Sequence, residues 1–225
     1  MRRRTGIGLA LKRLIDVAGA AAGLLLLSPA LAATALAVWA VDGRPVVFRQ
    51  VRPGLRGRPF TIYKFRTMRP PRAGEVWYRT DEQRLSRLGR FLRTTSLDEL
   101  PELWNVLRGD MSLVGPRPLL LEYLEIYTPE ERRRHDVQPG VTGWAVVNGR
   151  NALPFRERLR LDCWYVDHWS LALDLRILLL TARQVLRRAN AAAVEDDSAL
   201  GFPLADVAAE SKRRRETDTA TRGDQ

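Results

Sequence analysis

Cysteine, histidine and lysine are scarce in this sequence of 225 residues, which has one cysteine, two histidines and three lysines. With Cys163 alone, an intramolecular disulfide framework and a Cys-x-x-Cys metal site are both excluded. The P-loop, GxGxxG dinucleotide-binding and HExxH zinc-protease patterns are also absent, so those readings have no support in the sequence. Any catalytic chemistry is therefore left to carboxylates and arginines.

Positive charge, in contrast, is abundant. Of the 37 cationic residues 34 are arginines, and the formal net charge is +11. The excess lies in the first 190 residues, which carry +14. Such a body favours an anionic partner, whether phosphate, nucleic acid or lipid headgroup. The length allows one main domain, and a hydrophobic content of 45 % excludes a disordered chain.

An apolar segment at residues 14–41 has Asp16 as its one charged residue, and it predicts a membrane segment. As one straight helix it would reach about 42 Å, beyond a hydrocarbon core of about 30 Å. Ser28 and Pro29 interrupt it near the middle, and proline breaks or kinks a helix. Both flanks, residues 1–13 and the segment after 41, are rich in arginine, which favours the cytoplasmic side for each end.

These features favour a re-entrant helical hairpin over a single spanning helix. A tilted, kinked spanning helix remains the alternative. A signal peptide is disfavoured because the apolar stretch is long and no small-residue cleavage site follows it.

The chain after the membrane segment predicts a small α+β catalytic domain at residues 42–190. Runs of β-branched and aromatic residues at 46–51 and 60–65 flank a Gly- and Pro-rich stretch, which is typical of a β-hairpin. Helical spacing follows at 81–108. A further amphipathic helix is predicted by the apolar positions Leu171, Leu175, Leu178, Leu179, Ala182 and Leu186. It could cover the core or lie in the lipid interface. Residues 191–225 predict a mobile tail.

Asp98 and Glu99 are adjacent carboxylates at a predicted helix start. The stretch from Ser96 to Glu99 matches a capping box, in which the glutamate merely caps the helix. The same position also suits function, because a helix N-terminus stabilises an anion and offers N–H groups to a phosphate. An ionised aspartate beside a phosphate-bound metal ion can act as a nucleophile.

Arginines in loop-like settings surround this pair in the sequence. Two prolines, Pro116 and Pro118, stiffen the backbone around Arg117. Taken singly, each arginine is most simply a solvated charge, and Asp162 fits either a surface charge or a site carboxylate. The stretch 139–144 reads as a rigid, glycine-punctuated turn packed by its tryptophan.

Five segments in this order resemble the bacterial sugar transferase family, the monotopic phosphoglycosyl transferases. The segments are KRLIDVAGA, FRQVRPGLRGRPFTIYKFRTM, SLDELPELWNVLRGDMSLVGPRP, PGVTGWAVVNGRN and LDCWYVDHWSLALDLRIL. The chain is similar to short members, among them the enzyme that initiates bacterial N-linked glycosylation. The resemblance reverses the preference for a capping role of Asp98 and Glu99.

The resemblance implies an α+β membrane-associated fold with a re-entrant helix, interfacial helices and a small globular part with a β-hairpin, docked on the cytoplasmic face of the bacterial inner membrane. It implies Mg²⁺-dependent transfer of a sugar 1-phosphate from a UDP-sugar to polyprenyl (undecaprenyl) phosphate, with release of UMP. The oligomeric state and the sugar are left open.

The resemblance also assigns roles to residues. Asp98 is the expected nucleophile and metal-associated carboxylate, and Glu99 is its neighbour in catalysis. The expected substrate-binding positions are Lys64, Arg93, Pro116, Arg117, Pro118, Arg150 and Asp162. Val146 departs from the family, which usually carries glutamine there.

Two rival hypotheses remain. Direct transfer in a ternary complex would use the same fold without a covalent intermediate. A membrane-tethered nucleic-acid-binding protein would suit the positive charge, but the sequence shows no recognisable binding element, so no nucleic-acid partner is expected.

Overall fold

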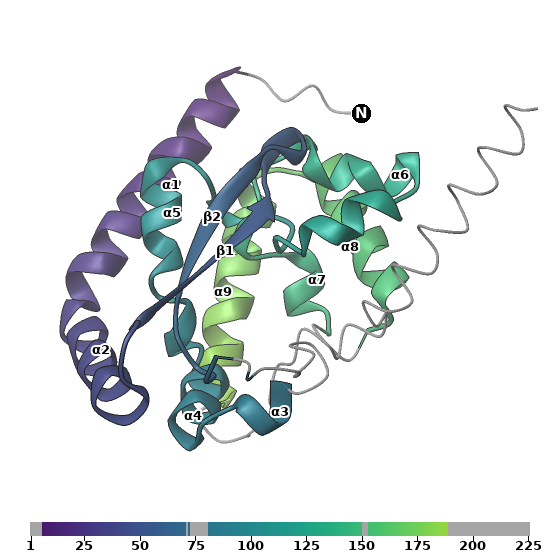
Figure 1. The fold of residues 1–225 in the computed structure, drawn as a ribbon. Coiled ribbons are helices and arrows are strands. Elements are labelled where there is room, and N and C mark those ends of the chain that lie inside the picture. Colours follow the sequence, from purple (N-terminus) through teal and green to yellow (C-terminus); the bar gives the residue numbers. More distant parts are fainter. Residues whose placement is uncertain (1–5, 71, 73–80, 150–152, 189–225) are drawn as a thin grey trace, which may run out of the picture.

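In the computed structural model, which describes residues 6–70, 72, 81–149 and 153–188, helices surround two small sheets (Figure 1). This mixture confirms the α+β expectation. The longer helices are α1 (Gly6–Leu26), α2 (Ser28–Asp42), α4 (Arg87–Thr95), α5 (Glu102–Arg108), α8 (Phe155–His168) and α9 (Leu171–Arg188). The strands are β1 (Val47–Pro53), β2 (Pro59–Phe65), β3 (Ser112–Val114) and β4 (Gly140–Thr142). Single turns are α3 (Asp81–Arg84), α6 (Pro129–Arg132), α7 (Trp144–Val147) and the 3₁₀ turns η1 (Leu55–Gly57), η2 (Leu97–Glu99), η3 (Leu121–Glu125) and η4 (Arg133–Asp136).

The N-terminal apolar segment forms two helices, which run along one side of the molecule in Figure 1. α1 and α2 meet at Leu27 and are bent by 62° relative to each other. Pro29 lies in the first turn of α2, where it can donate no hydrogen bond back to α1. The expected break at Ser28-Pro29 is thus confirmed to within one residue. No single described helix is long and apolar enough to cross a membrane, whereas this bent pair is, when its two helices are taken together.

Polar side chains fasten α1 to the rest of the molecule. Asp16 is buried, and its Oδ1 accepts hydrogen bonds from Ser112 Oγ and the Leu113 N–H, both at 3.0 Å. The guanidinium of Arg13 donates to the carbonyls at the end of α5, at 2.6 and 2.8 Å. Such charge-assisted bonds satisfy the orphan carbonyls of a helix C-terminus. The first half of α1 is therefore part of the globular body.

The far end of the helix pair is held as well. Arg66, which directly follows β2, is buried and donates to the carbonyls of Asp42, Gly43 and Arg44. These carbonyls lie at and just beyond the C-terminus of α2, where four groups lack helical partners. Both ends of the bent pair are consequently tied to the same body.

The predicted hairpin is confirmed. β1 and β2 pair antiparallel with Val47 opposite Phe65 and Pro53 opposite Pro59. β1 extends two residues and β2 one residue further into the loop than the sequence suggested, which leaves residues 54–58 as the turn. Lys64 stands at the end of β2, and Asn105 of α5 receives a hydrogen bond from the Tyr63 N–H at 3.2 Å. The hairpin is thereby docked on α5, close to the helix start that carries the carboxylates.

The amphipathic helix α9 is confirmed, but its predicted stripe is not its buried side. Ile177 and Asp174 are buried, whereas Leu175 and Leu179 are 59 % and 65 % exposed. One reason is that Asp174 is neutralised by three donors, which lets a carboxylate lie in the core. It accepts from Lys12 at 2.7 Å, Tyr165 at 2.7 Å and Trp169 at 3.1 Å.

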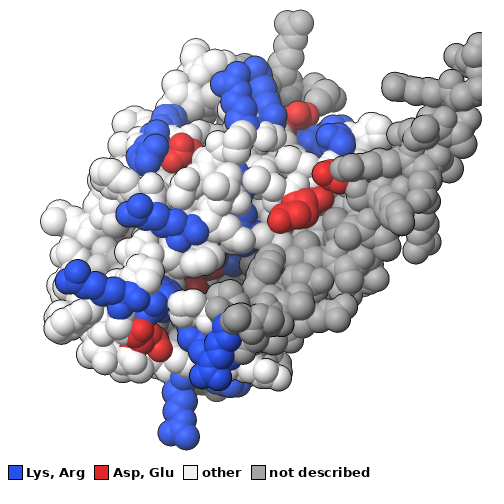
Figure 2. Space-filling model, viewed as in Figure 1, with Lys and Arg blue, Asp and Glu red and all other residues white. Residues whose placement is uncertain are grey.

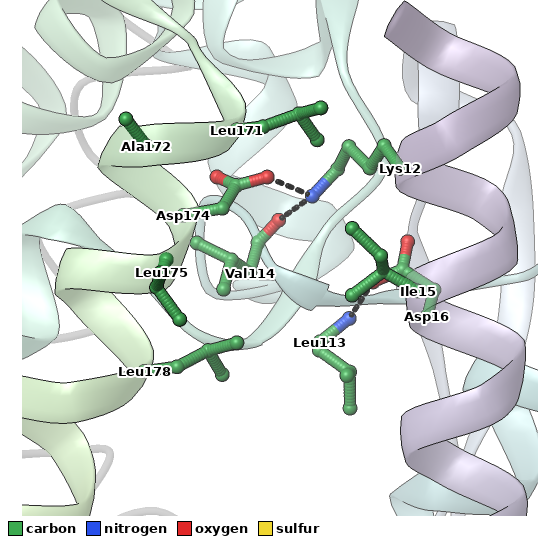
Figure 3. A pocket seen from close by; sticks show the side chains of 10 residues that line it. All are labelled: Lys12, Ile15, Asp16, Leu113, Val114, Leu171, Ala172, Asp174, Leu175 and Leu178. Atoms are coloured by element: carbon green, nitrogen blue, oxygen red, sulfur yellow. Dashed lines mark hydrogen bonds and ion pairs between the residues drawn. The ribbon is translucent and has the colours of Figure 1, made fainter.

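Between α1 and α9 lies a largely apolar cavity of about 290 Å³ (Figure 3). The Lys12–Asp174 ion pair crosses from one helix to the other at its edge, and Lys12 also donates to the Val114 carbonyl at 3.1 Å. Ile15, Leu113 and Leu178 are among the apolar lining residues. The cavity marks where α1 and α9 approach the strand β3 from opposite sides.

Candidate active site

Asp98 and Glu99 lie in the 3₁₀ turn η2, between α4 and α5. The preceding Ser96 adopts a left-handed conformation with φ 58°, and its N–H caps α4. Its side chain makes no capping hydrogen bond to η2. The capping-box interpretation is therefore wrong. Ser96, with its positive φ, ends α4, and the carboxylates of Asp98 and Glu99 are available for other contacts. A left-handed non-glycine residue costs of the order of 1 kcal/mol and is enriched at functional sites.

Glu99 is instead the centre of an ion-pair cluster. Its Oε1 lies 2.8 Å from Nζ of Lys64 and 2.5 Å from Nη2 of Arg117. The three residues come from η2, the end of β2 and the loop after β3, so the fold brings together positions that are far apart in sequence. The resemblance names Lys64, Glu99 and Arg117 as site positions, and the fold brings them into contact; their roles in catalysis and substrate binding stay predictions.

Glu102 adds a third carboxylate, which the sequence analysis missed. It lies one helical turn after Glu99, is almost fully buried, and its Oε1 is 3.1 Å from Nζ of Lys64. Burial raises the pKa of Glu102 to about 7, although the Lys64 charge opposes this shift. Burial lowers the pKa of Lys64, but the charges of Glu102 and Glu99 outweigh that effect and raise it overall. The i, i+3 spacing from Glu99 is the signal that could have revealed it.

Asp98 is buried, with 7 % of its surface exposed, and no hydrogen bond from a described residue engages its carboxylate. Burial and the neighbouring Glu99 charge raise its pKa, while Lys64, Arg93 and Arg117 oppose that rise. Asp98 therefore lies within electrostatic reach of three cations without being held by one of them through a hydrogen bond. A carboxylate of this kind keeps its lone pairs available for a substrate.

The loop that carries Arg117 packs directly against the glycine-rich stretch 139–144. A Cβ atom on Gly140 would lie 2.1 Å from the Gly115 nitrogen, and one on Gly143 would lie 2.2 Å from the Gly115 carbonyl oxygen. The Gly115 N–H donates to the Thr142 carbonyl at 2.9 Å. The stretch is thus more than a turn packed by its tryptophan, because its glycines let two backbones touch beside the site.

The remaining predicted residues are placed as follows. Arg93, on α4, donates from Nε to Thr67 Oγ1 at 3.1 Å. Pro116 and Pro118 flank Arg117 as the sequence requires. Asp162, on α8, is buried and pairs with Arg134 at 2.7 Å, behind the Arg117 loop. Arg150 and the tail 191–225 lie outside the described residues, as does most of the expected loop 69–80. The substrate-binding roles of all these positions stay predictions.

The carboxylates of the site fit Mg²⁺ only if the substrate phosphates supply further ligands to the same ion. No group of three or more His, Cys, Asp or Glu side chains in the described ranges is arranged to hold a metal ion. Mg²⁺ at nucleotide sites is typically held by one or two carboxylates together with substrate phosphates and waters. Asp98, whose oxygens are not engaged by a described donor, can supply such a carboxylate.

Comparison with known proteins gives one family and several close relatives. The model of the family described as bacterial sugar transferase matches residues 7–188. The chain is 54 % identical over 176 residues to the uncharacterized sugar transferase EpsL of Bacillus subtilis, which covers 78 % of this chain and 87 % of that protein.

Relatives with named activities are similar over the same region. The chain is 42 % identical over 190 residues to a UDP-glucose:undecaprenyl-phosphate glucose-1-phosphate transferase of Caulobacter vibrioides, covering 80 % of this chain and 71 % of that protein. It is 41 % identical over 167 residues to an undecaprenyl-phosphate galactose phosphotransferase of Salmonella typhimurium, covering 67 % and 35 %. The chain thus spans about a third of the length of the latter.

Proposed function

Because the chain belongs to the bacterial sugar transferase family, we propose that it transfers a sugar 1-phosphate from a UDP-sugar to a polyprenyl phosphate and releases UMP. Relatives from two bacteria are named for this reaction with glucose or for the corresponding galactose transfer. The undecaprenyl acceptor in those names is the acceptor proposed here.

The electrostatics of the cluster support anionic substrates. Figure 2 shows one face of the molecule, where basic side chains outnumber acidic ones and are spread widely. At the site itself, Lys64 and Arg117 pair with Glu99, and Arg93 adds a further positive charge near Asp98. Cations fixed in this way stabilise the charge that develops on transferring phosphoryl oxygens.

We propose Asp98 as the nucleophile of a two-step reaction. In the first step an Asp98 carboxylate oxygen forms a bond to the sugar-bearing phosphorus, and the bond from that phosphorus to the bridging oxygen breaks, so that UMP leaves with the bond's electron pair. In the second step a phosphate oxygen of the polyprenyl phosphate attacks the same phosphorus. The bond to Asp98 breaks and the free carboxylate is restored. The burial of this carboxylate, which accepts no hydrogen bond from the part of the chain that the structure describes, supports this role.

The other residues of the site orient the carboxylates and neutralise negative charge. Arg117 and Lys64 hold Glu99 beside Asp98, and their positive charges would attract the diphosphate oxygens of the donor. When bound by Asp98 and the diphosphate, Mg²⁺ would supply charge neutralisation and Lewis-acid polarisation of the phosphoryl oxygens. Glu102 gives the Lys64 ammonium a second carboxylate partner.

We further propose that the bent pair α1–α2 is re-entrant and that the catalytic part lies on the cytoplasmic face of the inner membrane. Arg13 ties one end of the pair to α5, and Arg66 ties the other end to β2. Between these anchors the outer faces expose large apolar side chains, among them Leu14, Leu25, Leu26, Leu36 and Trp39. A segment whose two ends are fixed to one body enters and leaves a bilayer on the same side.

The observation that carries the catalytic proposal is the buried Asp98, which lies beside the Glu99 cluster and accepts no hydrogen bond from a described residue. Covalent capture tests the proposal. The protein is incubated with a UDP-sugar and Mg²⁺ but no acceptor, and its intact mass is then measured. We expect an increase of one sugar phosphate that maps to Asp98 and disappears when undecaprenyl phosphate is added. Asp98→Asn should give neither adduct nor product. Asp110→Asn, at the end of α5, is the matched control and should behave as wild type.

Kinetics distinguish the rival mechanism. A covalent intermediate gives parallel double-reciprocal lines, whereas direct transfer gives intersecting lines. An active enzyme with intersecting lines and no adduct after rapid quenching would replace the two-step mechanism by direct transfer. A third measurement separates a transferase of either mechanism from a nucleic-acid-binding protein. A transferase releases UMP from a UDP-sugar and does not bind DNA.

The donor sugar is best assigned by competition. UDP-glucose, UDP-galactose and UDP-N-acetylhexosamines are compared as donors at equal concentration, with undecaprenyl phosphate as acceptor. The named relatives favour a hexose without an N-acetyl group, so UDP-glucose or UDP-galactose is expected to be preferred.

A further inference from the structure

The loop Gly115–Pro118 is anchored by the Gly115 N–H, which donates to the Thr142 carbonyl, and by the carbonyl oxygens of its other three residues. Pro116 and Pro118 have no N–H group, so backbone hydrogen bonds to them are possible only at their carbonyls. The Pro116 carbonyl accepts from the Gly140 N–H at 3.0 Å. The Arg117 carbonyl accepts from Nη2 of Arg134 at 2.7 Å, and the Pro118 carbonyl accepts from Nη1 of Arg52 at 3.5 Å. Of these three bonds, the one from Arg134 is the shortest, and it holds the residue that carries the site cation.

Arg134 is built into the core. It lies in η4, its side chain is 1 % exposed, and it is among the largest fully buried residues of the described chain. Nε and Nη2 donate to Oδ2 of Asp162 at 3.1 and 2.7 Å, and Nη1 donates to the Tyr127 hydroxyl at 3.4 Å. A buried guanidinium needs such partners, because an unpaired buried charge is strongly unfavourable. Asp162 and Tyr127 therefore fix the direction in which the remaining donor points.

On these contacts we propose that Arg134, oriented by Asp162, is a positioning residue that holds the Arg117 backbone so that the Arg117 guanidinium reaches Glu99. The chain of contacts runs from Asp162 through Arg134 to the Arg117 carbonyl, and from the Arg117 side chain to Glu99. Asp162 then acts through Arg134 and the loop, and does not touch the substrate. The expected effect on kcat/KM rests on the proposed function. The expected effect on the stability of the Arg117 loop does not.

A double-mutant cycle separates positioning from general stabilisation. Arg134→Lys keeps a buried cation but loses the forked pair of donors. We expect kcat/KM for UMP release to fall about tenfold or more, the rate equivalent of one lost charge-assisted hydrogen bond. If Arg134 acts through Arg117, the same change made in an Arg117→Ala background should have little further effect. Independent structural damage would instead add its full factor in both backgrounds.

A second variant keeps the test valid if single changes unfold the protein. Arg134→Met combined with Asp162→Leu removes the buried pair together, and apolar replacement of a buried pair is often neutral for stability. We expect this variant to fold and bind membranes but to lose activity. Arg133→Lys is the matched control, because Arg133 pairs with Glu130 and Asp167 near the surface, and it should retain full kcat/KM.

Hydrogen exchange gives a readout that needs no substrate. In Arg134→Lys, faster exchange confined to peptides covering residues 115–120 supports the anchor, even if the wild-type protein releases no UMP and the proposed function fails. Unchanged exchange in that loop would overturn the inference. So would additive activity losses in the cycle, or full activity of the folded Arg134→Met/Asp162→Leu variant.

Discussion

Oε1 of Glu102 lies 3.1 Å from Nζ of Lys64, in a position from which solvent is almost completely excluded. Lys64 is thereby paired with Glu102 as well as with Glu99. The site thus has three carboxylates in contact with, or close to, its cations. The protonation of Glu102 decides how much negative charge faces Lys64 near neutral pH, because its pKa is raised to about 7.

Glu102→Gln should flatten the pH dependence of stability. The folded-state pKa of about 7 exceeds the ordinary glutamate pKa of 4.5, so between these pH values the folded state retains a proton that the unfolded state has lost. The free energy of unfolding therefore falls with rising pH in this window, by at most about 1.4 kcal/mol per pH unit from this group. Thermal unfolding in one detergent, measured from pH 4.5 to pH 7, should show a shallower decline for the variant.

The control for this titration is Glu157→Gln, since Glu157 is a half-exposed acid on α8 that pairs with Arg160. It should reproduce the wild-type slope. Equal slopes for Glu102→Gln and wild type would show that folding does not raise the pKa of Glu102.

The sequence predicted those elements of the fold that depend on residues close together in the chain. The break at Ser28-Pro29 and the hairpin follow from proline geometry and from residue runs that stay close in sequence. The buried side of α9 could not be read in this way, because the stripe through Leu175 is apolar yet exposed, while Asp174 is buried by partners on α1 and α8.

In the site, too, contacts between residues far apart in sequence could not be predicted from local patterns. The pattern from Ser96 to Glu99 fits a capping box, but Lys64 and Arg117 offer Glu99 stronger, charge-assisted contacts that no local pattern contains. The run Arg132–Arg134 gives no sign that its third member is buried while Arg133 pairs near the surface. Contacts between residues far apart in sequence therefore require the structure, whereas Asp98 and Glu99 were singled out by their local pattern and given a predicted role by the resemblance.

Gly140→Ala should disturb the site through the backbone. The added Cβ would lie 2.1 Å from the Gly115 nitrogen, so β4 and the Arg117 loop must separate. We expect a destabilisation of about 1–3 kcal/mol, as for other overpacked positions, and a clear fall in UMP release. Gly6→Ala, whose Cβ would meet nothing within 4 Å, is the control. Unaltered melting and activity of Gly140→Ala would contradict the close packing of these two loops.

Arg150→Ala should reduce activity more than Arg150→Lys. The resemblance assigns Arg150 to phosphate binding, where a guanidinium can donate two parallel hydrogen bonds that an ammonium only partly replaces. A lost charge-assisted bond of about 1.5–3 kcal/mol corresponds to a rate loss of roughly tenfold to more than a hundredfold. Steady-state UMP release is the measurement, with the exposed Arg160→Ala as control. Wild-type rates for the alanine variant would make Arg150 a solvated charge.

Both ends of the α1–α2 pair should be inaccessible from outside intact cells. Arg13 and Arg66 fasten the two ends to one body, so a cysteine introduced by Arg4→Cys should react with an impermeant maleimide only after permeabilisation. The native Cys163 is buried, and burial raises its thiol pKa to about 11, so it should contribute little background. Arg160→Cys, on the exposed side of α8, marks the catalytic part and should label in parallel with position 4.

Pro29→Ala restores a donor at the bend and should favour a straighter pair, which raises outside labelling at position 4. Outside labelling at position 4 with an unaltered Pro29 would instead establish a spanning helix, because the two anchors cannot then lie on one side of the bilayer.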